Sequence, residues 1–259
     1  MMKVVILAGG KGTRISEESH LRPKPMIEIG GLPILWHIMK IYSHYGYNDF
    51  IICCGYKGHM IKEYFDNYYI HRSDITFDFS ADNKVTVHNN FAEPWRVTLV
   101  HTGRESMTGG RIKRVRSYVE DEPFMLTYGD GVSDIDINAL VRQHEASDKT
   151  VTLTATLPSG RFGVLELEDK TNSVIGFKEK AKENGQWINA GFMVMNPGVF
   201  NYLEDDNTVL EYEPLERLSN DMKLGVYKHH GYWQCMDTQR DKLNLENLWE
   251  SGTAPWKKW

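Results

Sequence analysis

The sequence predicts an α/β protein in which helices flank a mixed, mostly parallel sheet. Two observations lead to this class. Short apolar runs alternate with segments of helical periodicity as far as Thr156, as they do in parallel sheets with helical crossovers. The first apolar run, Val4–Ala8, has no polar interruption and ends directly in glycines, which indicates a strand buried on both faces.

Each expected element follows from a local pattern. Pro33 suits the first turn of a helix, Gly46 suits its end, and between them apolar side chains recur at helical spacing. Alternating polar and apolar residues within 68–95 indicate a β-hairpin inserted into the α/β pattern. In chain order we expect strands at 4–8, 50–54, 97–100, 124–128, 151–156, 164–167, 174–177 and 191–195, and helices at 33–45, 58–70, 110–119 and 136–147.

No linker rich in proline or serine divides the chain, so we expect a single Rossmann-like domain over residues 1–259. After about residue 160 the strand candidates follow one another closely, and we expect them to extend the same sheet with antiparallel or mixed pairing. The hairpin within 68–95 carries many apolar side chains for an exposed element, which predicts a contact between copies of the chain in a homo-oligomer.

Composition excludes several classes of protein. Of the 259 residues, 41% are hydrophobic and 25% are charged, which excludes collagen, disordered tails and disulfide scaffolds. A net charge of −5 disfavours a general nucleic-acid or anionic-membrane binder. No apolar stretch has the length of a membrane span, and the apolar start is too short for a secretory signal. Three cysteines, two of them adjacent, indicate reduced thiols in a cytoplasmic protein.

The strongest chemical signal is the glycine-rich segment directly after the first strand. Glycines let the backbone approach a ligand closely, and adjacent amides form a concave site for anions. Lysine and arginine side chains in the same segment add positive charge. The spacing is neither that of a dinucleotide-binding fingerprint nor that of a Walker A loop. We therefore expect phosphate binding by Leu7, Ala8, Gly9, Gly10, Lys11, Gly12, Thr13 and Arg14.

A second signal is the lysine in the segment Arg22-Pro23-Lys24-Pro25. The two prolines hold the backbone extended and rigid. Lys24 can therefore present its ammonium group to a fixed point. The alternative is a solvated surface lysine beside a turn.

Together these two segments resemble the signature of the sugar-nucleotide pyrophosphorylases, a family of nucleotidylyltransferases. That signature is L-A-G-G-x-G-T-R followed by R-P-K-P. The similarity runs from residue 3 to the C-terminal residues 254–257. Further segments resemble the branch of the family that joins CTP to glucose 1-phosphate, and they lie at 36–40, 53–58, 107–111, 127–131 and 236–238.

The resemblance implies a cytoplasmic enzyme that makes CDP-glucose and pyrophosphate from CTP and α-D-glucose 1-phosphate. An oxygen of the sugar phosphate attacks the α-phosphorus of the nucleotide in line, and no covalent enzyme intermediate forms. Positioning and charge neutralisation then supply the catalysis, and Mg²⁺ offsets the repulsion between the two polyanions. The resemblance also implies an assembly larger than a dimer and a role in supplying deoxysugars for cell-surface polysaccharides.

The resemblance assigns catalytic roles to Arg14, Lys24 and Asp130. Arg14 matches the family's residue for the triphosphate, and Lys24 matches its residue for the attacking phosphate. Asp130 follows a strand and lies between two glycines, so it meets the need for a metal-binding carboxylate near the glycine loop. Asp237 occupies the family's second metal position. Each carboxylate has a structural alternative, a turn cap for Asp130 and a helix cap for Asp237.

The resemblance assigns the segment before the third helix to the nucleobase. Arg111 can donate to the acceptors N3 and O2 of cytosine, whereas the N3–H of uracil or thymine would oppose it. The alternative is an ordinary residue near a helix N-terminus, where a cation gains nothing from the helix dipole. The predicted contacts of the nucleotide beyond the glycine loop are Ser106, Thr108, Gly109, Gly110, Arg111 and Gly129.

The resemblance places the sugar phosphate toward the second half, so residues 1–160 would bind mainly the nucleotide and residues 161–259 mainly the sugar phosphate. Glu179 and Lys180 resemble the family's pair for the sugar hydroxyls and the phosphate, and their alternative is a solvated strand end. The segment I-N-A-G-F at 188–192 resembles the family's I-N-G-G-F, with Ala190 in place of a glycine. The predicted sugar-phosphate contacts are Lys24, Tyr128, Glu179, Lys180, Asn189, Ala190 and Gly191.

Two alternatives stay open from the sequence. The first is the same chemistry with UTP, dTTP or another hexose 1-phosphate. The second is a non-catalytic subunit that senses a nucleotide or a sugar phosphate. Such a subunit should lack loop cations or metal carboxylates, and this chain has all five, which favours an enzyme: Lys11, Arg14, Lys24, Asp130 and Asp237.

Overall fold

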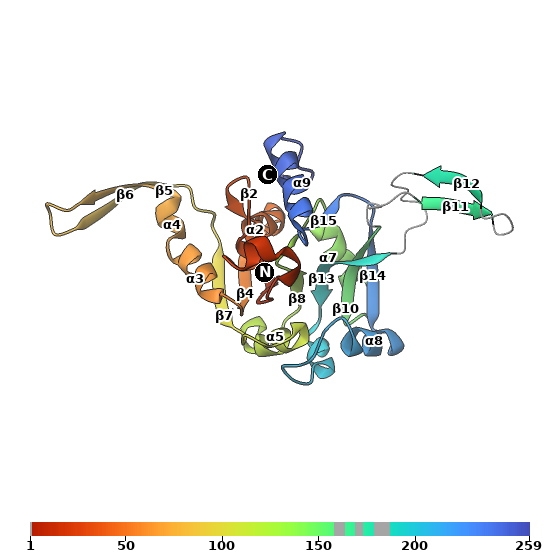
Figure 1. The fold of residues 1–259 in the computed structure, drawn as a ribbon. Helices are drawn as coiled ribbons and strands as arrows, with labels where there is room; N and C mark the ends of the chain where they lie inside the picture. Colours follow the sequence, from red (N-terminus) through yellow and green to blue (C-terminus); the bar gives the residue numbers. More distant parts are fainter. Residues whose placement is uncertain (1, 158–163, 169–172, 179–186) are drawn as a thin grey trace.

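The computed structural model describes residues 2–157, 164–168, 173–178 and 187–259. A seven-stranded sheet forms the centre of this described part (Figure 1). Its strands lie in the order β14-β10-β13-β8-β1-β4-β7. Only β13 runs antiparallel to its neighbours among these strands. The bounds are β1 Lys3–Ala8, β4 Asp49–Cys54, β7 Arg96–His101, β8 Phe124–Tyr128, β10 Val151–Thr156, β13 Ile188–Met195 and β14 Leu224–His229.

Helices cover both faces of this sheet because successive strand residues point to opposite sides. In β1, Val4, Ile6 and Ala8 pack into one apolar cluster, whereas Val5 and Leu7 pack into the other. The helices of the first cluster are α2 Ile34–His44, α3 Gly58–Asp66, α7 Ile137–Glu145 and α9 Gln239–Glu250. The helices of the second are α5 Thr108–Arg114, α6 Arg116–Val119, the 3₁₀ helix Pro197–Tyr202 and α8 Glu213–Asn220.

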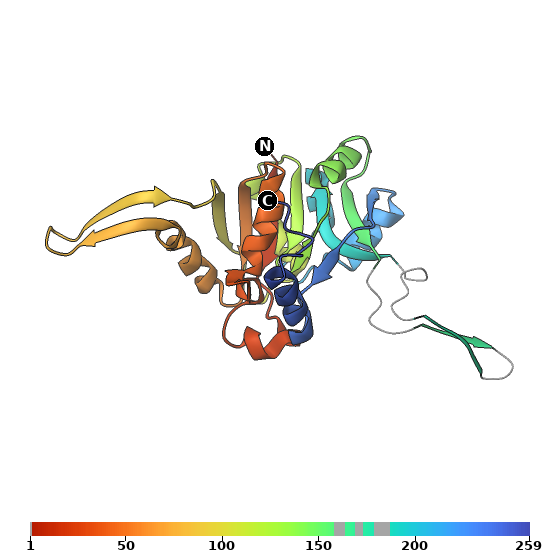
Figure 2. The same cartoon turned by 90° about the horizontal axis from the view of Figure 1, so that it is seen from above.

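Shorter elements carry the loops around the sheet. Figures 1 and 2 show the hairpin of β5 (Ser73–Asp78) and β6 (Lys84–Asn90) projecting beyond the edge strand β7. The pair of β11 (Val164–Glu168) and β12 (Ser173–Lys178) projects on the other side. The remaining elements are β2 Glu28–Ile29, β3 Leu32–Pro33, β9 Gly131–Ser133, β15 Trp233–Cys235, α1 Ser16–Ser19, α4 Tyr68–His71 and the 3₁₀ helices Thr13–Ile15 and Lys24–Met26.

The predicted fold class and the predicted hairpin are confirmed, and three local expectations are wrong. The helix expected at 58–70 is two helices separated at Asn67, and the helix expected at 110–119 is two helices separated at Val115. β11 and β12 do not extend the central sheet. They pair with each other, because β14 already occupies the outer edge of β10 and β13 fills the place between β10 and β8.

The C-terminal segment packs against α2 and so fixes the position of α9. The buried indole of Trp256 donates to Nδ1 of His37 at 3.4 Å, and His37 Nε2 donates to the carbonyl of Ile29 at 2.8 Å. Trp249 of α9 packs edge-on against the same imidazole, with ring centroids 4.6 Å apart. These contacts hold α9 in place, and Asp237 lies just before its N-terminal end.

A candidate active site at the ends of β1 and β8

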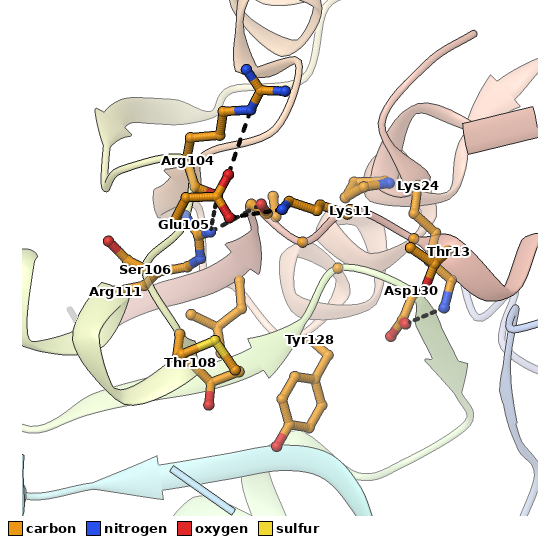
Figure 3. A pocket seen from close by; sticks show the side chains of 18 of the residues that line it. Lys11, Thr13, Lys24, Arg104, Glu105, Ser106, Thr108, Arg111, Tyr128 and Asp130 are labelled. Atoms are coloured by element: carbon orange, nitrogen blue, oxygen red, sulfur yellow. Dashed lines mark hydrogen bonds and ion pairs between the residues drawn. The ribbon is translucent and has the colours of Figure 1, made fainter. Parts of the chain in front are cut away.

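The candidate site lies where two central parallel strands end side by side. Leu7 of β1 is the register partner of Tyr128 of β8, so the segments that follow both strands meet at one edge of the sheet. A cavity of about 520 Å³ opens there (Figure 3). Most of the predicted site residues line it, namely the segment from Leu7 to Arg14 together with Lys24, Ser106, Thr108, Arg111, Tyr128, Gly129 and Asp130.

The glycine loop needs its glycines for close approach and for backbone conformation. A Cβ on Gly9 would lie 2.2 Å from Nη1 of Arg111, so the guanidinium group could not pack there. Gly12 has a φ of +63°, which favours glycine, and its carbonyl accepts from the amide of Ile15 at 3.2 Å. The loop therefore closes into the 3₁₀ helix that carries Arg14.

Lys24 lies between the two predicted metal carboxylates. Its ammonium nitrogen is 2.6 Å from Oδ2 of Asp130 and 2.6 Å from Oδ1 of Asp237, and only 11% of its side chain is exposed. Burial lowers the pKa of Lys24, but the charges of Asp130 and Asp237 outweigh this effect and raise the pKa above its usual value. The alternative of a solvated surface lysine is wrong.

Asp237 contacts Lys24 and Arg14, which line the cavity, and does not cap α9. Thr238 is the N-cap of α9, and it forms a capping box with Asp241. Burial raises the pKa of Asp237, but Lys24 and then Arg14 outweigh this effect, and the pKa is lowered overall. Nη1 of Arg14 lies 2.5 Å from Oδ2 of Asp237.

The donor set fits a hard divalent cation. Oxygens of Asp130 and Asp237 already contact one shared cationic group, the ammonium of Lys24. Within the described residues no group of three or more histidine, cysteine, aspartate or glutamate side chains could hold a metal. Mg²⁺ is bound in nucleotide sites by one or two carboxylates, and phosphate oxygens and water complete its coordination. Two carboxylates beside the glycine loop, for which phosphate binding is predicted, meet that requirement.

Lys11 is also paired with a carboxylate. Its ammonium nitrogen lies 2.7 Å from Oε2 of Glu105, and this hydrogen bond lowers the pKa of Glu105 (Figure 3). Sequence reasoning missed Glu105, although it directly precedes the segment expected to read the base. Lys11, Arg14 and Lys24 thus each have a carboxylate partner before any substrate binds.

Arg111 is buried and joins the glycine loop to the segment opposite. Nη2 donates to the carbonyl of Gly9 at 3.0 Å and to that of Arg104 at 3.4 Å. Nη1 donates to the hydroxyl of Thr102 at 2.9 Å and to the carbonyl of Gly103 at 2.7 Å. The guanidinium group is therefore fixed in orientation at the wall of the cavity, and its contact with the base stays a prediction.

Gly109 and Gly110 do not line the cavity, although Thr108 and Arg111 on either side of them do. Both amides donate to the carbonyl of Thr208, at 2.9 and 3.2 Å. A Cβ on Gly110 would lie 2.6 Å from the backbone of Asp206. These glycines therefore let α5 approach the 206–208 loop closely, and only their contact with the nucleotide stays a prediction.

Glu211 is a second residue that sequence reasoning missed. One of its carboxylate oxygens accepts from the hydroxyl of Thr108 at 2.6 Å, and the other accepts from the hydroxyl of Tyr128. Burial and the charge of Glu211 raise the pKa of Tyr128. No local pattern in residues 209–212 signals this role, which depends on a contact between distant segments.

The predicted sugar residues of β13 contact Tyr128. The side-chain amide nitrogen of Asn189 lies 3.5 Å from the Tyr128 hydroxyl. Gly191, at a φ of +84°, packs against the Tyr128 ring. Ala190 is buried, and its carbonyl accepts from the indole of Trp233 at 2.8 Å. Glu179 and Lys180 lie outside the described residues.

Fold and site together define the class of protein. The model of the nucleotidyl transferase family matches residues 3–234, and the chain belongs to this family. The resemblance found in the sequence is therefore confirmed.

Curated relatives show which branch of this family the chain is most similar to among those compared. The glucose-1-phosphate cytidylyltransferases of Salmonella typhimurium and Salmonella typhi are each 58% identical to this chain over 259 residues, with full coverage of both chains. Among solved structures, the inositol-1-phosphate CTP transferase from T. maritima superposes with a TM-score of 0.68 at 16% identity. That superposition covers 100% of this chain and 97% of the other, and it supports the fold.

Among the described residues, no helix is long and apolar enough to cross a membrane.

Proposed function

We propose that this protein transfers a cytidylyl group from CTP to α-D-glucose 1-phosphate and releases pyrophosphate, which makes CDP-glucose. The observation that carries the proposal is the single cavity that unites the glycine loop, Lys24 and Asp130, with Asp237 bonded to Lys24 beside it. The glucose-1-phosphate cytidylyltransferases that are 58% identical support the choice of both substrates.

The residues of the chain bind and orient two anionic substrates. The glycine loop, Lys11 and Arg14 hold the triphosphate, while Lys24 neutralises and orients the attacking sugar phosphate. Asp130 and Asp237 would hold Mg²⁺, which when bound neutralises charge on the phosphates. No side chain needs to form a covalent bond to the substrate.

We assign the base to the wall formed by residues 104–111 and the sugar to the region near Tyr128 and Asn189. Arg111 would donate hydrogen bonds to the acceptor edge of cytosine. To do so it would give up its long hydrogen bond to the carbonyl of Arg104. In this division, residues 1–160 hold mainly the nucleotide, and residues 161–259 of the same domain hold mainly the sugar phosphate.

The assembly and the compartment are part of the proposal. Exposed apolar side chains on the β5–β6 hairpin, among them Phe79 and Phe91, support a homo-oligomer. Three free cysteines, two of them buried, support a reducing, cytoplasmic compartment.

A nucleotide comparison tests the proposed activity. The purified protein is mixed with glucose 1-phosphate, Mg²⁺ and one of CTP, UTP or dTTP, and pyrophosphate release is measured. We expect kcat/KM for CTP to exceed that for the others by about a hundredfold or more, because unmatched donors in the site oppose the N3–H of uracil and thymine. Equal turnover of UTP or dTTP would contradict the choice of base, and turnover of none would contradict the enzyme.

A further inference from the structure

The position of Lys24 raises a question that its phosphate-binding role does not answer. A lysine whose role is to bind a substrate phosphate needs no contact with the two carboxylates that are expected to bind the metal. Yet its ammonium nitrogen is 2.6 Å from an oxygen of Asp130 and 2.6 Å from an oxygen of Asp237. Both carboxylates are largely buried, with 28% and 16% of their side chains exposed.

We propose that Lys24 acts as an internal counter-ion, which occupies the metal position of the free enzyme and moves to the substrate phosphates when the nucleotide brings the metal. This inference rests on the proposed function and adds a second role for Lys24. In the free enzyme the ammonium group prevents two neighbouring carboxylates from facing each other without a cation between them.

Metal binding to the free enzyme is weak for an electrostatic reason. A divalent cation that arrives alone must displace a buried ammonium group, whose ion-pair partners among the described residues are Asp130 and Asp237. When the sugar phosphate binds beside Lys24, its oxygens accept the ammonium group and the carboxylates become free for the metal that the nucleotide brings. The two binding events therefore favour each other, and this coupling is reciprocal.

Arg14 is a weaker competitor for the same site. Among the described residues its ion-pair partner is Asp237, through Oδ2, and 76% of its side chain is exposed. Lys11 contacts neither carboxylate, since its partner is Glu105. Lys11 therefore provides a matched control, because its removal changes the net charge of the site by the same amount and leaves the carboxylate pair intact.

The test measures Mn²⁺ binding to nucleotide-free protein by the loss of the electron paramagnetic resonance signal of aqueous Mn²⁺. We expect Lys24→Met to bind Mn²⁺ at least about tenfold more tightly than the wild type, since coupling of this kind commonly spans about 5- to 150-fold. Lys11→Met should bind Mn²⁺ like the wild type. Lys24→Arg, which keeps the cation, should stay within about threefold of the wild type, well below that coupling range.

Three outcomes would overturn the inference. The first is equal Mn²⁺ affinity of Lys24→Met and the wild type. The second is a gain in Mn²⁺ affinity in Lys11→Met that equals the gain in Lys24→Met. The third needs no Lys24 variant to fold: tight Mn²⁺ binding by the free wild type that Asp130→Asn abolishes would show that Lys24 does not occupy the metal position. Turnover of CTP by the wild type is measured separately, so a failure of this inference is distinguishable from a failure of the proposed function.

Discussion

At the scale of single residues, three cations of the site are paired with carboxylates before any substrate arrives. Lys11, Arg14 and Lys24 each contact a carboxylate, and the two carboxylates beside Lys24 are half-buried or more. Isolated charges in such a place would carry a large desolvation cost. The pairing offsets this cost, so we expect substrate binding to exchange one ionic partner for another.

Asp130→Ala tests the metal carboxylate. We expect kcat/KM to fall about a thousandfold or more, because charge on the phosphates would no longer be neutralised at this point. The fold should survive, since Lys24 keeps Asp237 as its partner, and the thermal midpoint should change by only a few degrees. Steady-state kinetics and circular dichroism check both statements.

The matched control for Asp130→Ala is Glu105→Ala, which removes an exposed carboxylate from the other side of the cavity. We expect its kcat/KM to stay within about tenfold of the wild type, as exposed ion pairs contribute little. Wild-type turnover by Asp130→Ala would refute the metal role.

Gly191 provides a steric prediction at the Tyr128 ring. Its φ of +84° disfavours a side chain, and a Cβ would lie 2.3 Å from the ring. We expect Gly191→Ala to lower the free energy of unfolding by about 2–4 kcal/mol, since overpacking adds to backbone strain. Gly31→Ala is the control, because Gly31 has a φ of +74° and open space around it. Chemical denaturation should show a loss of only about 1 kcal/mol there, and an equal loss in both variants would contradict the steric argument.

At the scale of elements, sequence patterns predict a strand or helix correctly where its own residues show which of its faces are buried. β1 is predictable because both of its faces are buried, so its residues form one continuous apolar run. α2 is predictable because its apolar spacing and the flanking Pro33 and Gly46 agree. The separate pairing of β11 with β12 depends on which strands fill the central sheet, so local patterns do not reveal it.

The same limit applies to the site. The glycine loop and Asp130 each follow a recognisable strand, so sequence alone indicates their chemistry. The approach of Asp237 to Asp130 depends on the pairing of β15 with β9, in which Cys235 lies opposite Gly131. In addition, the amide of Met236 donates to the carbonyl of Asp130 at 2.8 Å. No periodicity reveals such a register, and Asp237 was predicted only because its position matches the family.

His37 makes the packing of α2 against the C-terminal segment sensitive to pH. Burial lowers the pKa of His37 to about 4 from its usual 6.5, and a proton on Nδ1 would also face the N–H of Trp256. Between pH 6.5 and pH 4 the unfolded chain binds a proton that the folded chain does not. Stability contributed by the neutral ring is therefore present above pH 6.5 and lost as the pH falls to about 4.

The size of this loss in stability follows from how far the pKa of His37 is lowered. Between pH 7 and pH 4 the wild type should lose about 3 kcal/mol more unfolding free energy than His37→Gln, whose amide can replace both hydrogen bonds without titrating. Denaturation curves at both pH values measure the difference. The same loss in the two proteins would show that His37 does not titrate in this window.

At the scale of the whole molecule, the hairpin exposes apolar surface that a single chain does not cover. Phe77 and Phe79 are 48% and 81% exposed, and their rings stack with centroids 6.4 Å apart. Figures 1 and 2 show this hairpin projecting away from the body of the chain. Projecting apolar residues of this kind commonly mark contacts between proteins, and a second copy of the chain is the partner that we propose.

The double substitution Phe77→Ser and Phe79→Ser should therefore reduce the size of the assembly. Burying two phenylalanine side chains contributes about 1.5–3 kcal/mol each, and every copy in a symmetric assembly loses the same contact. Light scattering at micromolar concentration should show a mass above that of the monomer for the wild type and a lower mass for the variant. Met222→Ser, which replaces an apolar side chain that is 76% exposed and lies outside the hairpin, should keep the wild-type mass. A monomeric wild type, or a variant of unchanged mass, would contradict the assembly through this hairpin.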